Sequence, residues 1–300
     1  MIYFSRNLIS CFAAASCALL LGACQGAPGF TGGGSNASYD HIYTYANTQD
    51  GSLPLQLNVY QPEGACTAPR PTIVYVHAGS FYIGDRYEGA FRGHARLFTD
   101  AGFNFISIDY RLIPDSPQVS DAYRPLILND SDFTQQQYTA NAAAIEDTIA
   151  ALRWVEIQGE DICHEPGNVI LFGGSAGAIV SLNLTYALDD FGLTAPPVRG
   201  VISDCGGHLL DGSVAKGDVP SLFIHGQRDG LVPVREAQES WAQLVNQGVP
   251  AQIYTYKSAG HCVNLHRETV NGQPLTNVML EFARNVSTGG EVATVSRLGL

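Results

Sequence analysis

A single short motif constrains the fold of this chain more than any other feature. The pattern Gly-Gly-Ser-Ala-Gly occupies residues 173–177, with Ser175 at its centre. An apolar run at 169–172 precedes it, and a stretch without an early helix breaker, 176–188, follows it. In this context the pattern is typical of a tight strand-to-helix turn that exposes the serine oxygen, and its glycines allow backbones to approach closely. The N-terminus of the expected helix behind Ser175 also favours a developing negative charge. The turn and the helix together make Ser175 a candidate nucleophile.

Short apolar runs and helical stretches alternate along the rest of the chain. We expect strands at 41–45, 53–60, 72–77, 104–109, 169–172, 201–203, 222–225 and 252–256, and helices at 93–101, 139–158, 176–188, 235–247 and 275–284. The first two runs alternate apolar and polar residues, as in a half-exposed antiparallel pair, whereas the later runs are almost continuously apolar, as in strands buried on both faces. This predicts an α/β fold with a mostly parallel, eight-stranded sheet covered by helices on both faces.

Residues 1–23 are predicted to be an export signal. One positive charge, Arg6, is followed by an uncharged apolar stretch at 8–23 that is too short for a comfortable membrane span. The stretch ends in Leu-Gly-Ala-Cys, which resembles the lipobox of bacterial lipoproteins, and this resemblance implies that the signal is cut before Cys24 and that Cys24 receives lipid. The alternative is an ordinary cleaved signal, in which Cys24 is lost or spare.

The expected domain organisation follows from this beginning. Residues 24–38 are rich in glycine and are predicted to be a flexible tether, 39–285 a single catalytic domain, and 286–300 a loose polar tail. We therefore expect an exported protein of the bacterial cell envelope whose membrane contact is the lipid on Cys24. By the same resemblance, Gln25 favours the outer membrane, because an aspartate does not follow the cysteine.

Charge and composition exclude some partners. The formal net charge is −12 and no run is rich in lysine or arginine, which argues against nucleic acid or an anionic lipid surface as the main partner. Histidines, cysteines and aspartates show no metal-ligand spacing, so neither a metal nor an organic cofactor is expected. The long stretch 113–138 contains prolines and aromatic residues, and both an ordered flap near the site and a floppy surface insertion are compatible with it.

A serine nucleophile requires a base, and the base requires a carboxylate that orients it. In this type of site the chain order is serine, acid, histidine. Asp229 follows the expected strand at 222–225, and His261 lies in the loop after the strand at 252–256, so these two residues are the candidate acid and base. The less well-placed alternatives are Asp204 for the acid and His208 and His266 for the base, while His225 is expected to be a packed structural histidine.

Several segments together resemble a known family. The segment His-Ala-Gly-Ser-Phe at 77–81 follows a buried strand and is a candidate source of backbone donors for an oxyanion, although a plain tight turn would read similarly. Together with Ile-Asp-Tyr-Arg-Leu at 108–112, the motif at 173–177, Asp-Gly-Leu-Val-Pro at 229–233 and Gly260-His261, it resembles the carboxylesterases related to hormone-sensitive lipase, within the α/β-hydrolases. The resemblance covers most of the expected domain.

The resemblance implies the α/β-hydrolase fold and a serine esterase that acts through an acyl-enzyme, on a small-molecule or glycan-linked ester. It implies that the amides of Gly79, Ser80 and Ala176 bind the oxyanion. Ala78 and Ser80 replace two glycines of the family's usual His-Gly-Gly-Gly loop, which leaves the acyl preference open. A second departure is that too few residues precede the first expected strand to form the family's N-terminal cap. Two alternatives are a serine peptidase of the prolyl-oligopeptidase type and a non-catalytic binding protein on the same fold.

Four cysteines lie beyond the signal and tether: Cys66, Cys163, Cys205 and Cys262. An even number in an exported domain is consistent with disulfides. In the expected fold the strands at 72 and 169 are neighbours; Cys66 and Cys163 precede them, whereas Cys205 and Cys262 follow their strands at the catalytic end. The predicted pairs are Cys66–Cys163 and Cys205–Cys262, and the alternative is four buried thiols.

Overall fold

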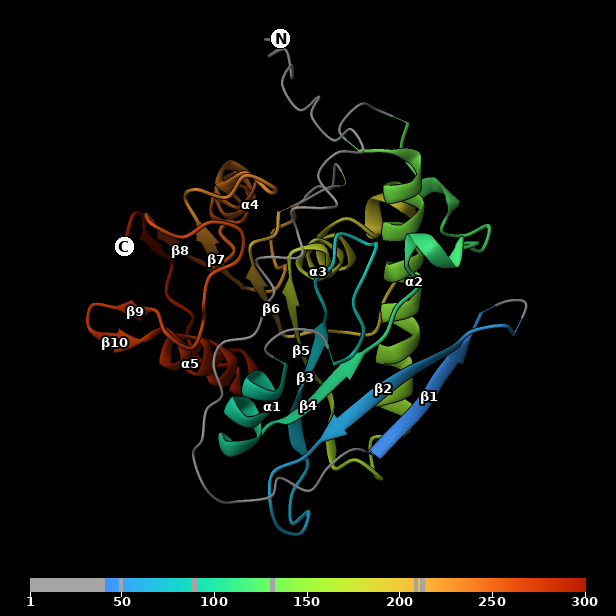
Figure 1. Cartoon of the computed structure of the whole chain (residues 1–300). Coiled ribbons are helices and arrows are strands. Elements are labelled where there is room, and N and C mark those ends of the chain that lie inside the picture. Colours follow the sequence, from blue (N-terminus) through green and yellow to red (C-terminus); the bar gives the residue numbers. More distant parts are fainter. Residues whose placement is uncertain (1–40, 49–50, 88–90, 130–132, 208–209, 211–213) are drawn as a thin grey trace.

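A twisted nine-stranded sheet, in the order β1-β2-β4-β3-β5-β6-β7-β8-β11, forms the centre of the protein (Figure 1). The computed structural model describes residues 41–48, 51–87, 91–129, 133–207, 210 and 214–300. The predicted export signal, the tether with Cys24, and the alternative base His208 lie outside the described residues.

The sheet is parallel except at one edge, where β1 pairs antiparallel with β2, and β2 pairs antiparallel with β4. The strands are β1 (His41–Asn47), β2 (Pro54–Tyr60), β3 (Arg70–Val76), β4 (Asn104–Ile108), β5 (His164–Gly174), β6 (Gly200–Asp204), β7 (Ser221–Gly226), β8 (Ala251–Tyr256) and β11 (Val295–Arg297), with a small separate hairpin of β9 (Thr269–Val270) and β10 (Gln273–Pro274). Each expected strand is present. In the antiparallel pair, β1 is exposed or half-buried along its length, whereas β2 is mostly buried and does not show the exposed alternation that its sequence predicts.

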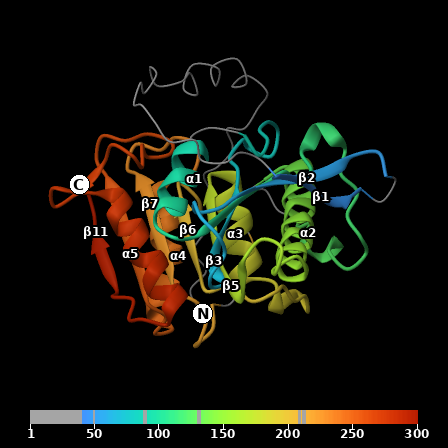
Figure 2. The ribbon, with the colours of Figure 1, turned by 90° about the horizontal axis from the view of Figure 1, so that it is seen from below.

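Helices cover both faces of the sheet (Figure 2). They are α1 (Phe91–Asp100), α2 (Gln135–Ile157), α3 (Ala176–Tyr186), α4 (Val234–Asn246) and α5 (Leu275–Thr288). Apolar residues of α2, α3 and α4 belong to one core, and those of α1 and α5 to the other. None of the described helices combines the length and the apolar character that a membrane span requires.

The continuously apolar strands contribute side chains to the hydrophobic cores on both faces of the sheet. Along β3, Ile73 faces the core under α1 and α5, whereas the next residue, Val74, faces the core under α2 and α3. In β5, Ile170 and Leu171 divide in the same way. Because successive side chains of a strand point to opposite faces, a strand covered on both sides must be apolar at every position, which explains the unbroken runs.

The prediction of a loose tail at 286–300 is wrong, and so is the count of eight strands. Helix α5 continues to Thr288 and ends at Gly289, which has a φ of 68°. The chain then returns to the sheet, where β11 pairs in parallel with β8. A short edge strand with exposed, polar residues carries almost no apolar pattern, because one side of it has no neighbour and its faces are only partly covered.

The described part of the stretch 113–138 packs on α2 rather than projecting from the surface. Arg111, at its start, contacts Asp147 at 2.7 Å and Glu146 at 2.8 Å, both on α2. The Arg111 guanidinium also donates to the carbonyl of Gln118 at 2.5 Å. The buried side chain of Leu126 joins the core beneath α2. Burial of an arginine with two carboxylates and a carbonyl satisfies its donors, so this connection is an ordered part of the fold.

At the amino-terminal end of the parallel strands, Cys66 and Cys163 form a disulfide with a Cα–Cα distance of 5.8 Å. These residues precede β3 and β5, which pair in parallel with Arg70 opposite His164. The amide of Arg70 donates to the carbonyl of Cys163 at 2.8 Å, so a backbone hydrogen bond lies beside the disulfide. This pair is the one that the strand positions predict.

Candidate active site

Ser175 occupies a strained turn between β5 and α3. Its φ of 49° and ψ of −115° lie in a region that residues with a side chain seldom adopt. The glycines around it are required sterically: a Cβ on Gly173 would lie 2.3 Å from the carbonyl oxygen of Gly177, and one on Gly177 would lie 2.0 Å from that of Val76. The sequence therefore folds locally into the turn that the glycine spacing predicts, with the Ser175 side chain at the N-terminus of α3.

The structure brings Ser175, His261 and Asp229 together. The Oγ of Ser175 lies 2.8 Å from Nε2 of His261, and Nδ1 of His261 lies 2.8 Å from Oδ2 of Asp229. An ionised carboxylate only accepts, so Nδ1 carries the hydrogen and Nε2 offers its lone pair to the serine hydroxyl. The three residues come from loops after β5, β7 and β8, and they meet because the carboxyl ends of parallel strands share one edge of the sheet.

Asp229 is held as an anion by several donors. Its side chain is fully buried, and Oδ1 accepts from the amides of Leu231 at 2.8 Å and Val232 at 2.9 Å. Burial alone would raise the pKa of Asp229, but hydrogen bonds from His225, His261 and the Leu231 amide outweigh it and hold the pKa well below its usual range. These donors therefore favour the ionised form of Asp229 despite its burial.

The side chain of His225 contacts the candidate acid Asp229, which the sequence interpretation did not predict. Its Nε2 lies 3.1 Å from Oδ2 of Asp229 and 2.8 Å from the carbonyl oxygen of Val232. Because a carbonyl only accepts, Nε2 carries a hydrogen that faces both oxygens. The sequence interpretation of His225 as a packed histidine missed this contact, although its place at the end of β7, four residues before Asp229, was the available signal.

The alternative acid and one alternative base have other partners. Asp204 ends β6, and its Oδ1 accepts from the amide of Val263 at 3.2 Å; burial raises the pKa of Asp204 to about 7. The carboxylate at Nδ1 of His261 is that of Asp229. His266 lies with its Nε2 at 3.1 Å from Nδ1 of His94, a residue of α1.

The segment after β3 turns sharply in front of Ser175. Gly79 has a φ of 130°, and Ser80 and Phe81 follow with φ values of 56° and 63°. A Cβ on Gly79 would lie 1.7 Å from the carbonyl oxygen of Ile83, so only glycine fits there. Within the described part of the chain, neither the Gly79 amide nor the Ser80 amide donates to a backbone carbonyl. Ala78 has no positive φ, which explains why alanine is accepted in place of the family's glycine.

Side chains fix this segment at both ends. The ring of Tyr110 stacks on His77 with centroids 4.1 Å apart, and its hydroxyl donates to the His77 carbonyl at 2.8 Å. Further along, Nη1 of Arg86 contacts Oδ2 of Asp109 at 2.6 Å, and the Arg86 amide donates to Oδ1 of Asp109 at 2.8 Å. Backbone amides held in a rigid loop suit the binding of an oxyanion, because they need not reorient during a reaction.

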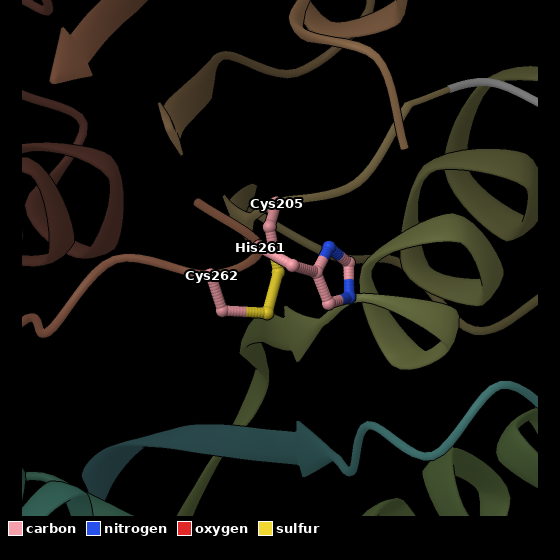
Figure 3. Close-up of side chains that lie close together, drawn as sticks. All are labelled: Cys205, His261 and Cys262. Atoms are coloured by element: carbon pink, nitrogen blue, oxygen red, sulfur yellow. A yellow bond between two sulfur atoms is a disulfide. The ribbon is translucent and has the colours of Figure 1, made fainter. Parts of the chain in front are cut away.

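A disulfide lies directly beside the histidine (Figure 3). Cys205 follows β6 and bonds to Cys262, with a Cα–Cα distance of 4.8 Å. The two sulfurs and a ring nitrogen of His261 lie within 4.8 Å of one another. Because the sulfurs are bonded to each other, they offer no thiolate to a metal ion. This pairing is again the one that the strand positions predict.

Comparison with known proteins defines the fold. Residues 139–215 match the family described as alpha/beta hydrolase fold, and residues 213–288 match the Prolyl oligopeptidase family. Esterase 2 of Thermogutta terrifontis, in its apo form, superposes with a TM-score of 0.62 over 85% of this chain and 97% of that chain, at 17% sequence identity. The chain has the α/β-hydrolase fold. Its expected fold class is thereby confirmed.

Two of the curated sequence relatives are esterases of Mycobacterium tuberculosis. Esterase LipI of Mycobacterium tuberculosis is 30% identical over 149 residues, which cover 48% of this chain and 38% of that protein. Carboxylesterase NlhH of Mycobacterium tuberculosis is 28% identical over 151 residues, which cover 50% of this chain and 38% of that protein. The chain thus spans about two fifths of the length of these curated relatives.

Proposed function

We propose that this α/β-hydrolase chain is a serine esterase that hydrolyses carboxylic esters through an acyl-enzyme. The observation that carries the proposal is the continuous line of hydrogen bonds from Ser175 through His261 to Asp229, each of 2.8 Å, with Ser175 held in a strained turn at the N-terminus of α3. A nucleophile, a base and an orienting carboxylate in this geometry are the requirements of acyl transfer. The likeness to proteins named as esterases supports the same chemistry.

In acylation, Oγ of Ser175 attacks the ester carbonyl carbon while Nε2 of His261 takes the hydroxyl proton. The Asp229 carboxylate stabilises the imidazolium, and the amides of Gly79, Ser80 and Ala176 donate to the oxyanion of the tetrahedral intermediate. When the intermediate collapses, the carbon–oxygen bond to the alcohol breaks, and His261 returns the proton to the leaving alkoxide. The alcohol departs, and the acyl group remains on Ser175.

Deacylation repeats these steps with water. His261 removes a proton from a water molecule, whose oxygen attacks the acyl carbon, and the same amides bind the new oxyanion. Collapse breaks the bond to Ser175, and His261 returns the proton to the serine oxygen. A carboxylic acid is released and the free enzyme is restored, so the proposal needs no metal or organic cofactor.

The decisive experiment is Ser175→Ala in the full chain. We expect this change to abolish covalent labelling by a fluorophosphonate and to lower kcat for p-nitrophenyl acetate by about 10³-fold or more. Ser287→Ala, the same change at a serine whose hydroxyl donates to the Arg284 carbonyl on α5, is the matched control and should keep wild-type activity. Persistent labelling of the Ser175→Ala variant would refute the proposal.

A second candidate is a serine peptidase of the prolyl-oligopeptidase type. The match of residues 213–288 to that family favours it, because these residues include both Asp229 and His261. Peptide p-nitroanilides compared with p-nitrophenyl esters of increasing acyl length, and with acetylated and feruloylated sugars, separate the two reactions. We expect ester hydrolysis to exceed amide hydrolysis by kcat/KM, and the reverse order would favour the peptidase.

A further inference from the structure

The end of strand β6 contacts the nucleophile side of the site through its backbone. The amide of Ser175 donates to the carbonyl of Asp204 at 2.8 Å. The amide of the next residue, Cys205, donates to the carbonyl of Ile224 in β7, also at 2.8 Å. Because Ser175 has an uncommon backbone conformation, a hydrogen bond to its own amide helps to hold that conformation.

The side chains of the same two residues reach the histidine side of the site. Oδ1 of Asp204 accepts from the amide of Val263 at 3.2 Å. Cys205 is bonded to Cys262. Cys262 and Val263 are the two residues directly after His261, so both are tied to the end of β6. Figure 3 shows the Cys205–Cys262 bond beside His261.

These contacts are buried, and the triad does not use them. Asp204 is 7% exposed and Cys205 is fully buried. Burying a carboxyl group is costly unless it is hydrogen-bonded, and here the donor is the Val263 amide, whereas the acid that contacts His261 is Asp229. The ionisable groups that face Asp204 are His225 of β7 and Asp229 of the following loop. Since the Val263 amide needs an acceptor oxygen, an uncharged carboxyl group or a carboxamide can also accept its hydrogen bond.

We infer that Asp204 and the Cys205–Cys262 disulfide are positioning groups that hold His261 in line with Ser175. They touch none of the reacting atoms; they act on the two residues that follow the base, while the Asp204 carbonyl fixes the nucleophile's turn. This inference rests on the proposed function. A displacement of about 1 Å between catalytic groups can cost about 100-fold in rate, so a link that couples both halves of the site has a large effect.

The first test compares Asp204→Ala with Asp204→Asn in the full chain. We expect Asp204→Ala to lower kcat for p-nitrophenyl acetate, and the rate of fluorophosphonate labelling, by about 10- to 100-fold, with KM changed less than about twofold. Asp204→Asn keeps an acceptor for the Val263 amide and should restore kcat to within about threefold of wild type. Asp218→Ala removes a similar carboxylate–amide hydrogen bond, to Ala215, before β7, and should leave kcat unchanged.

The second test needs no change at Asp204. In a Cys66→Ala, Cys163→Ala variant, Cys205–Cys262 is the disulfide left among the described residues. A dithiol reductant converts it to two thiols and is itself oxidised to a disulfide. We expect kcat to fall by about tenfold on reduction, with unchanged circular dichroism, and to recover on reoxidation.

The outcomes separate this inference from the proposed function. Wild-type kcat in Asp204→Ala, an equal loss in Asp204→Asn and Asp204→Ala, or an equal loss in Asp218→Ala would overturn it. If Asp204→Ala does not fold, the reduction test decides, and an unchanged kcat after reduction overturns it. Failure of the wild-type protein to hydrolyse any ester or to be labelled at Ser175 would instead refute the esterase proposal.

Discussion

The two disulfides lie at opposite ends of the same parallel sheet and have different surroundings. Cys66–Cys163 joins the segments that lead into β3 and β5, far along the strands from Ser175. Cys205–Cys262 joins the end of β6 to the residue after His261. The first disulfide joins two segments that lie away from the candidate site, whereas the second joins a strand end to the loop that carries the candidate base.

Chain entropy does not distinguish the two bonds. They connect residues that are 97 and 57 positions apart, and loops of these lengths correspond to about 4 to 5 kcal/mol of stabilisation each. The dependence on length is logarithmic, so the difference between them is only about 0.5 kcal/mol. The two disulfides therefore stabilise the fold by similar amounts and differ in position, because only Cys205–Cys262 lies beside the candidate base His261.

In this comparison, the largest expected effect on kcat comes from a pair of glycine substitutions, one at each end of the parallel strands. Gly79→Ala places a Cβ 1.7 Å from the Ile83 carbonyl oxygen, and the oxyanion loop must shift. We expect kcat for p-nitrophenyl acetate to fall by about 10²- to 10³-fold, as when an oxyanion donor is lost. Gly102→Ala, before β4, has a similarly positive φ of 95° but no atom within 4 Å of the new Cβ.

Gly102→Ala is thus the control for backbone strain, which costs about 1 kcal/mol at either position. It should lower the urea midpoint while kcat stays within about twofold of wild type. If both glycine variants lose activity equally, the rigid-loop account of the catalytic end is wrong.

A smaller effect sharpens the comparison of the disulfides themselves. Cys205→Ala with Cys262→Ala and Cys66→Ala with Cys163→Ala should each lower the free energy of unfolding by about 2 to 5 kcal/mol. Only the first pair should also reduce kcat, by about tenfold, because it frees the loop that carries His261. Urea unfolding and ester hydrolysis, measured on the same preparations, check both parts; an equal loss of kcat in the two variants would contradict the distinction.

The smallest expected effect on activity belongs to a pH dependence of stability at the catalytic end. Burial raises the pKa of Asp204 from its ordinary value of 3.8 to about 7, so the folded state holds this proton more tightly than the unfolded chain does. The stabilisation is complete below pH 3.8 and is lost as the pH rises to about 7. Asp204→Asn should remove this dependence.

Urea midpoints at pH 4.5 and 7.5 measure it: relative to Asp204→Asn, the wild type should be less stable at the higher pH than at the lower. Asp100→Asn, at an exposed residue of α1, is the control and should follow the wild-type profile. A wild-type profile parallel to that of Asp204→Asn would contradict the shift.

Much of the fold could be predicted from local sequence patterns. The glycines around Ser175 and the apolar runs before Asp229 and His261 are signals carried by neighbouring residues, and the structure brings these three residues together. Strand β11 could not be predicted, because three partly covered residues at a sheet edge have no apolar period. The end of α5 was placed too early for a related reason: apart from Val286, the residues of its last turn are polar.

Contacts between distant strands were the other part that the sequence could not provide. The approach of His225 to Asp229 depends on how the loop after β7 folds back, with the amides of Leu231 and Val232 turned toward the same carboxylate. The hydrogen bond from Val263 to Asp204 joins residues 59 positions apart. Periodicity describes single elements, whereas such pairings depend on the sheet order and on loop paths.

The junction at the end of β6 also has a consequence for folding. The Asp204–Cys205 segment meets Ser175, Ile224 and the Cys262–Val263 segment, which lie far from one another along the chain. Contacts of such long sequence separation form late, because loop closure must precede them. Helices can appear and the sheet can begin to assemble before β8 is in place, yet the base has nothing to align it until then. Under the proposed function, ester-cleaving activity should therefore appear only after β6, β7 and β8 have come together.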